Sequence, residues 1–96
     1  SPMVLSVKNE AVKNTGLSVI NPVLNHQLQI MVNDQKLSGN ANLQIITFDG
    51  RKVLERQIGL DQGKNMLSVS ELTAGSYILT IKKGEFSKIF KITVKP

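Results

Sequence analysis

The sequence predicts an all-β protein, an Ig-like antiparallel β-sandwich of seven or eight short strands. Three observations lead to this prediction. Short runs of apolar or alternating residues recur along the 96 residues, turn residues separate them, and no segment has a convincing helical period. Near the end, the spacing Leu72-x-x-Gly75-x-Tyr77 is typical of a tyrosine corner, in which a tyrosine hydroxyl bonds backbone a few residues upstream in a sandwich.

The chain is expected to divide at residue 16. Val4–Lys8 is predicted as a short strand, and Asn9–Gly16 is polar and reads as a linker. We therefore predict that residues 1–16 are a short strand and a linker, and that residues 17–96 are the sandwich.

The first strands of the sandwich are predicted at Leu17–Ile20 and around Leu28, Ile30 and Val32. The first should end at Asn21-Pro22, because proline has no N–H to donate to a sheet. The second shows the alternation of a half-buried strand.

The middle of the chain predicts a hairpin. Leu43–Phe48 is apolar at nearly every position, as expected of a central strand covered on both faces. Asp49-Gly50 is a strong hairpin signal, and Val53–Ile58 should be the returning strand. A further strand is expected at Asn65–Val69.

The last two strands are predicted at Gly75–Lys82 and Phe86–Lys95. In the final strand, Phe86, Phe90, Ile92 and Val94 should face inward, and Lys91, Thr93 and Lys95 outward. The net charge of the chain is +5, and residues 82–96 alone hold five lysines and one glutamate. A basic surface of this kind attracts anionic partners, although lysine is also common on any solvated sheet.

No residue pattern points to catalysis, a cofactor or a metal. The chain has no cysteine, and its one histidine, His26, has no nearby ligand partners in the sequence. Asp34 and Asp61 lie in polar loops without the ligand alternation of a calcium loop. Without tryptophan, and with Phe48, Tyr77, Phe86 and Phe90 expected in the core or the corner, sugar stacking and nucleic-acid binding are disfavoured. We predict that the protein is not an enzyme.

The order of these signals resembles the type A C-terminal sorting domain of the Bacteroidetes type IX secretion system. The similarity extends over about residues 17–96. It rests on four elements in order: Asn21-Pro22, the hairpin at Asp49-Gly50-Arg51-Lys52-Val53, the corner at Gly75-Ser-Tyr77, and a lysine-bearing last strand. The sequence departs from the family pattern at Ala74, where proline is common, and at Val19-Ile20, where an aromatic-proline pair is common.

The resemblance implies that the domain is a secretion signal for an attached cargo. The cargo would pass through the periplasm, and the type IX outer-membrane translocon and its shuttle proteins would recognise the domain. The cargo would then reach the cell surface or the medium. In many members a sortase-like peptidase removes the domain, and we expect any cleavage in Asn9–Gly16 or just upstream, where a protease finds extended backbone.

We expect the partner-recognition surface on the last hairpin, at Lys82, Lys83, Lys88, Lys91 and Lys95. An alternative is that these lysines only protect a sheet edge from unwanted pairing. At the level of the whole domain, the competing interpretation is a generic Ig-like or fibronectin-like spacer, adhesion or carbohydrate-binding module of a surface protein.

Overall fold

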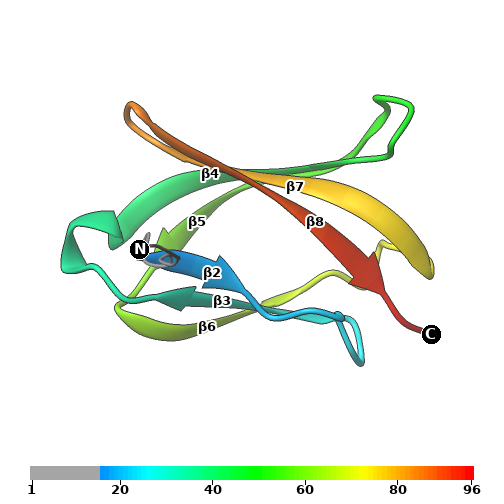
Figure 1. The fold of residues 1–96 in the computed structure, drawn as a ribbon, viewed down its shortest axis with the longest axis horizontal. Helices are drawn as coiled ribbons and strands as arrows, with labels where there is room; N and C mark the ends of the chain where they lie inside the picture. The colour runs from blue at the N-terminus through cyan, green and yellow to red at the C-terminus, as the bar shows by residue number, and fades with distance from the viewer. Residues whose placement is uncertain (1–15) are drawn as a thin grey trace, which may run out of the picture.

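The computed structural model describes residues 16–96, which form a sandwich of two antiparallel sheets (Figure 1). One sheet has three strands in the order β2-β3-β6, and the other has four in the order β5-β4-β7-β8. The predicted all-β sandwich is confirmed. The expected strand at Val4–Lys8 and the expected linker, apart from Gly16, lie outside the described residues.

The three-stranded sheet consists of β2 (Leu17–Val19), β3 (Gln27–Val32) and β6 (Gly63–Ser68). β3 lies in the middle, where Ile30 pairs with Val19 on one side and with Asn65 on the other. The even-numbered residues of β3 are buried and the odd-numbered ones are exposed or half-buried, as the alternation predicts. β2 ends just before Asn21-Pro22, so the predicted strand stop is confirmed.

The four-stranded sheet consists of β4 (Gly39–Ile46), β5 (Lys52–Leu60), β7 (Gly75–Lys83) and β8 (Phe86–Val94). A short 3-10 helix, η1 (Gln35–Leu37), leads into β4. β4 and β7 are central, while β5 and β8 form the two edges of this sheet. The final strand of the chain is therefore an edge strand.

The Asp49-Gly50 hairpin forms where it was predicted. Thr47 N–H donates to Arg51 O at 2.8 Å, and Gly50 N–H donates to Thr47 O at 3.0 Å. Gly50 has a φ of 94°, a conformation that glycine adopts without strain. The Asp49 carboxylate accepts a hydrogen bond from the Thr47 hydroxyl, and this bond together with the Arg51 N–H lowers the pKa of Asp49 below its usual range.

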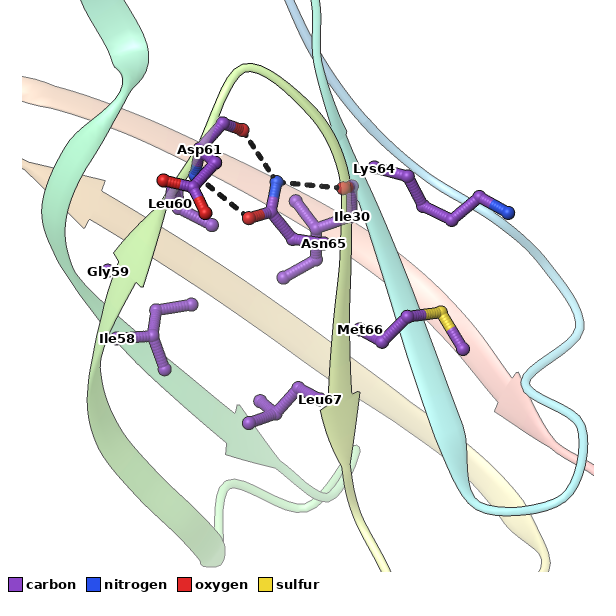
Figure 2. Close-up of a pocket in the computed structure, with 9 residues that line it drawn as sticks. All are labelled: Ile30, Ile58, Gly59, Leu60, Asp61, Lys64, Asn65, Met66 and Leu67. Carbon is purple, nitrogen blue, oxygen red and sulfur yellow. Dashed lines mark hydrogen bonds between the residues drawn. The ribbon is translucent and has the colours of Figure 1, made fainter.

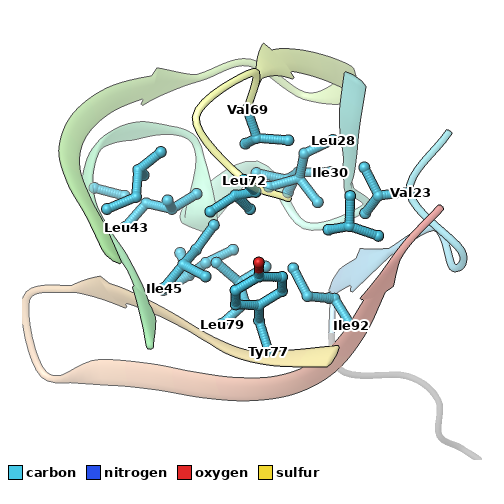
Figure 3. Close-up of a cluster of buried hydrophobic side chains, with 14 of the residues drawn as sticks. Val23, Leu28, Ile30, Leu43, Ile45, Val69, Leu72, Tyr77, Leu79 and Ile92 are labelled. Carbon is cyan, nitrogen blue, oxygen red and sulfur yellow. The ribbon is translucent and has the colours of Figure 1, made fainter. Parts of the chain in front are cut away.

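The core fills the space between the two sheets (Figure 3). Leu28 and Ile30 of the three-stranded sheet and Leu43, Ile45 and Leu79 of the four-stranded sheet are at most 1% exposed. No polar or charged residue is buried in the described part of the chain. Truncating one such leucine to alanine typically costs about 2–5 kcal/mol, so this apolar layer determines the stability of the fold.

The tyrosine corner is also confirmed. Tyr77 lies near the start of β7, and its hydroxyl donates to Thr73 O at 2.8 Å. The ring is buried beside Leu72, whose side chain is 2% exposed. Gly75 begins the strand with a φ of 154°, which is rare for residues with a side chain. The corner therefore attaches the loop before β7 to the core.

The prediction that Leu43–Phe48 is covered on both faces is wrong. Leu43 and Ile45 are buried, but Gln44 and Ile46 are half-buried on the outer face of the sheet. Phe48, expected in the core or the corner, is 57% exposed. The reason is that Phe48 lies in the hairpin turn after β4 and its ring contacts Lys91 on the outer face of the four-stranded sheet, which the other sheet does not cover.

Candidate recognition surface

The candidate surface is built on the hairpin that joins β7 to β8. Its two-residue turn is Gly84-Glu85, and Lys83 pairs with Phe86 across it. Gly84, at the first central position, has a φ of 59°, as a type II′ turn requires. This turn and the Thr47–Arg51 turn lie at opposite ends of the four-stranded sheet (Figure 1).

The inward and outward residues of β8 follow the predicted alternation. Ile92 and Val94 are buried, and Phe86 and Phe90 are half-buried against the core. Lys91 is exposed on the opposite face. The burial of β8 is greatest near its C-terminal end, so the half that leaves the turn is the more exposed one.

The five predicted lysines do not share one face. By strand alternation, Lys82 and Lys91 lie on the outer face of the four-stranded sheet. Lys83 and Lys88 lie on its inner side near the turn, where both are half-buried, and Lys95 follows the end of β8. The hairpin thus presents positive charge on both of its faces.

An apolar and basic patch covers part of the outer face. It consists of Phe48, Ile89 and Lys91, and we call it the outer-face patch. Ile89 is 67% exposed, and the Lys91 ammonium lies 5.6 Å from the centre of the Phe48 ring. An exposed cation–π contact of this kind is worth about 0.5–1 kcal/mol. The contact brings together the turn after β4 and the last strand.

The positive charge of the hairpin is not neutralised within residues 16–96. The ion pairs in this part of the chain are Lys52–Glu55, at 2.6 Å, and Arg56–Glu71. None of the five candidate lysines takes part in them. The Lys88 ammonium instead lies over Phe90, 5.8 Å from the centre of the ring. The charge is therefore available to an anionic partner.

Asn21 closes part of the free edge of β8. Its side-chain amide donates to Lys91 O at 2.9 Å, and its Oδ1 accepts from Thr93 N–H at 3.1 Å. Val23 N–H donates to Thr93 O at 2.7 Å, and Lys95 N–H donates to Val23 O at 2.9 Å. After β2, the chain thus crosses to the other sheet and covers the C-terminal half of the β8 edge. We call these contacts the Asn21 clamp.

This role of Asn21 was not predicted from the sequence, and neither was the exposure of Phe48 and Ile89. Asn21-Pro22 was interpreted as a strand stop and as one element of the family pattern. A side-chain amide has the same donor and acceptor as a peptide group, so an asparagine just after a strand is a weak signal for edge capping. Its partner lies 70 residues further along the chain, which the sequence alone does not indicate.

A shallow pocket of about 270 Å³ lies between β5 and β6 (Figure 2). Ile58 and Leu67 line it from the two sheets. At one end the Asn65 amide donates to Asp61 O and accepts from Asp61 N–H, both at 2.8 Å. The Asn65 side chain in this pocket is thus engaged in holding the β5–β6 turn.

The acidic residues and the histidine were also compared with the geometry of a metal site. Within residues 16–96, no group of three or more histidine, aspartate or glutamate side chains could hold a metal ion. His26 is half-buried in a turn, with a φ of 57°, and its carbonyl accepts from Val69 N–H. The same part of the chain has no helix long and apolar enough to cross a membrane.

Together, these observations describe an all-β sandwich with a basic hairpin at one edge. A family model described as "secretion system C-terminal sorting domain" matches residues 21–95. Since this match covers most of the chain, the protein belongs to that family, the C-terminal sorting domains of the type IX secretion system. A search of curated proteins found no significant match.

Membership of this family establishes the role of the domain. It is a sorting signal of the type IX secretion system, and the family is not one of enzymes. The role implies an attached cargo and export to the cell surface or the extracellular space. The matched range contains the Asn21 clamp, the tyrosine corner and the last hairpin.

Proposed function

We propose that the type IX outer-membrane translocon and its shuttle proteins recognise this domain through the β7–β8 hairpin. The observation that supports this proposal is the group of five lysines on the hairpin, none of which is ion-paired within residues 16–96. Such a surface accelerates the encounter with an acidic partner and orients it. The sandwich behind the hairpin holds its backbone in place.

In this proposal, the cargo travels through the periplasm with the domain already folded. Once the hairpin has docked, the translocon moves the cargo to the cell surface or the medium. The core includes residues from Leu17 to Val94. This supports the proposal that the domain folds as a unit without contacts to the cargo.

We further propose that a sortase-like peptidase, where it acts on this protein, cuts upstream of β2. A peptidase needs several residues of extended, unpaired backbone, and most of the chain from Leu17 to Val94 belongs to paired strands. The expected region is residues 9–16 or just upstream. N-terminal sequencing of the processed domain tests this, and a cleavage site inside Leu28–Val94 would contradict it.

The test of the recognition surface is a reporter fusion. A fluorescent protein with a secretory signal is fused to residues 4–96 and expressed in a host with type IX machinery. In the double variant Lys82→Ala and Lys91→Ala, the reporter should accumulate in the periplasm, with a several-fold lower exported fraction.

The matched control is the double variant Lys36→Ala and Lys64→Ala. Both of these lysines are exposed, lie outside the last hairpin and form no ion pair within residues 16–96. This control removes the same number of positive charges, two, and its reporter should be exported normally. Equal export of both double variants would contradict the proposal.

Edge protection remains the second role proposed for the lysines. β8 is an edge strand, and lysine on such a strand discourages association with other chains. If this were the only role, the Lys82 and Lys91 variant would be exported normally but would dimerise or aggregate. Analytical ultracentrifugation of the purified variant distinguishes the two roles.

A further inference from the structure

The N-terminal half of β8 has an open edge. Thr93 N–H and C=O both point away from β7, because they bond Asn21 and Val23. Backbone groups alternate along a strand, so those of Ser87, Ile89 and Lys91 point to the same side. Lys91 O is bonded to Asn21, but the three N–H groups and the other two carbonyls have no partner within residues 16–96.

The open edge of β8 ends, on its C-terminal side, at the Asn21 clamp. Asn21 and Val23 occupy the edge from Lys91 O to Lys95 N–H. Any additional strand must therefore pair with Ser87–Lys91, between the Asn21 clamp and the turn at Gly84-Glu85. Five residues span about 16 Å, which is the length of a typical edge contact.

The side chains around the open edge favour an acidic partner. A strand added here would have the outer-face patch, with Ile89 and Lys91, beside one of its faces. Its other face would lie beside Lys88 and Phe90. Lysine thus occurs on both sides of the edge, and Glu85 is the only acidic residue in the hairpin.

We infer that an extended segment of the partner, carrying aspartate or glutamate side chains, adds to the four-stranded sheet as a fifth strand along Ser87–Lys91. This inference rests on the proposed recognition through the β7–β8 hairpin. Backbone hydrogen bonds to β8 provide affinity in this mode of binding, and the lysines select an acidic sequence. The Asn21 clamp sets where the added strand must end.

The test removes single N–H groups from sheet edges. Ile89→Pro and Ser87→Pro each delete an N–H that points away from β7, so the β7–β8 pairing keeps its donors. The matched control is Gln57→Pro. The same alternation, followed across β7 and β4, places the Gln57 N–H on the free edge of β5.

The readout is export of the same reporter fusion, after circular dichroism has shown that each variant is folded. Ile89→Pro should reduce the exported fraction by roughly tenfold, the effect of one lost interface hydrogen bond. Gln57→Pro should be exported normally. Ile89→Ala keeps the N–H, so its exported fraction should fall less than that of Ile89→Pro. If Ile89→Pro fails to fold, export of the Ser87→Pro variant tests the inference instead. Ser87 lies next to the turn, where proline should disturb the strand less.

A charge reversal tests the acidic nature of the added strand. Lys82→Glu with Lys91→Glu should block export more strongly than the alanine pair, because it repels an acidic segment. Equal defects in the two pairs would contradict an acidic partner.

The outcomes separate this inference from the proposed function. If the lysine variants block export but both β8 proline variants are exported normally, the inference of an added strand is wrong. The proposed recognition through the hairpin is then still supported. If Gln57→Pro blocks export as strongly as the β8 variants, the effect is not specific to β8 and the inference is wrong. If every variant is exported normally, both proposals are wrong.

Discussion

The two edge strands of the four-stranded sheet, β5 and β8, differ in whether their charged side chains form ion pairs. On β5, Lys52 is paired with Glu55, and Arg56 bonds both Glu71 and Ser68 O. On β8, no lysine has an acidic partner within residues 16–96. The basic side chains of β5 are ion-paired within the domain, whereas those of β8 remain available to a partner molecule.

This difference is the reason why we propose only one of the two edges of the four-stranded sheet, β8, as the recognition surface. Both edges have unpaired backbone groups, so hydrogen-bonding capacity alone does not distinguish them. The basic charge of the β7–β8 hairpin and the exposed Ile89 do. The predictions below test this contrast, beginning with the largest expected effect.

The largest effect is expected for Phe90→Pro. Phe90 pairs with Leu79, and its N–H points toward β7, so proline here removes a donor within the sheet. The acceptor left unpaired on β7 costs about 1–3 kcal/mol. Loss of the half-buried Phe90 ring adds to this cost, so the fall in the free energy of unfolding should be the largest of the set. Thermal denaturation followed by circular dichroism measures it. Equal melting temperatures for Phe90→Pro and Ile89→Pro would show that the assigned direction of the β8 backbone groups is wrong.

A smaller effect is expected for Tyr77→Phe, which affects both edges through the core. This change removes the hydroxyl that bonds Thr73 O and leaves the ring in place. The free energy of unfolding should fall by about 1–2 kcal/mol. Amide exchange should accelerate in β5 and β8 alike, because global unfolding becomes more frequent. A change confined to one edge would contradict the role of the corner as a common anchor.

Asn21→Ala should extend the open part of β8 toward its C-terminal end. Two exposed hydrogen bonds are lost, so we expect a destabilisation of about 1 kcal/mol. Hydrogen exchange of the Thr93 amide should accelerate beyond this global effect, while that of the Ile92 amide should not. Unchanged protection at Thr93 would show that the clamp does not hold this edge.

The smallest effect is expected from acid, and it should affect the β4–β5 side only. The hydrogen bond from Lys52, followed by that from Asn42, lowers the pKa of Glu55, and Thr47 together with Arg51 lowers the pKa of Asp49. The ionised Glu55 and Asp49 side chains contribute their full stabilisation above the unfolded pKa values, about 4.3 for glutamate and about 3.9 for aspartate. It is lost as the pH falls through the lower folded values.

Chemical-shift titration of the two carboxyl groups measures this effect. The β4–β5 hairpin should loosen at acid pH while β8 keeps its structure. In the double variant Asp49→Asn and Glu55→Gln, the difference between the two edges should disappear. Simultaneous loosening of β8 in the unmodified protein would contradict the assignment.

Much of the fold could be predicted from local patterns. Asp49-Gly50, Asn21-Pro22 and the corner at Tyr77 specify turns or strand ends through chemistry within a few residues. The alternation in β8 likewise predicted that Ile92 and Val94 face inward. The prediction for Leu43–Phe48 was wrong because an apolar run does not show that only one face of its sheet is covered. Phe48 contacts Lys91 on the uncovered outer face.

The candidate surface was predicted only in part. The density of lysine in residues 82–96 located the hairpin, but it did not show that Lys82 and Lys91 share a face from which Lys83 and Lys88 point away. It also did not show which of the basic residues of the chain are already paired. Both depend on the register of strands that are distant in the sequence.

The class of fold, the turns, the inward side of each late strand and the family of the protein follow from the amino-acid sequence alone, because they depend on neighbouring residues and their order. The part of β8 that stays open depends instead on tertiary packing. Asn21 reaches Lys91 and Thr93 across some 70 residues of chain, and only packing of the two sheets brings them together.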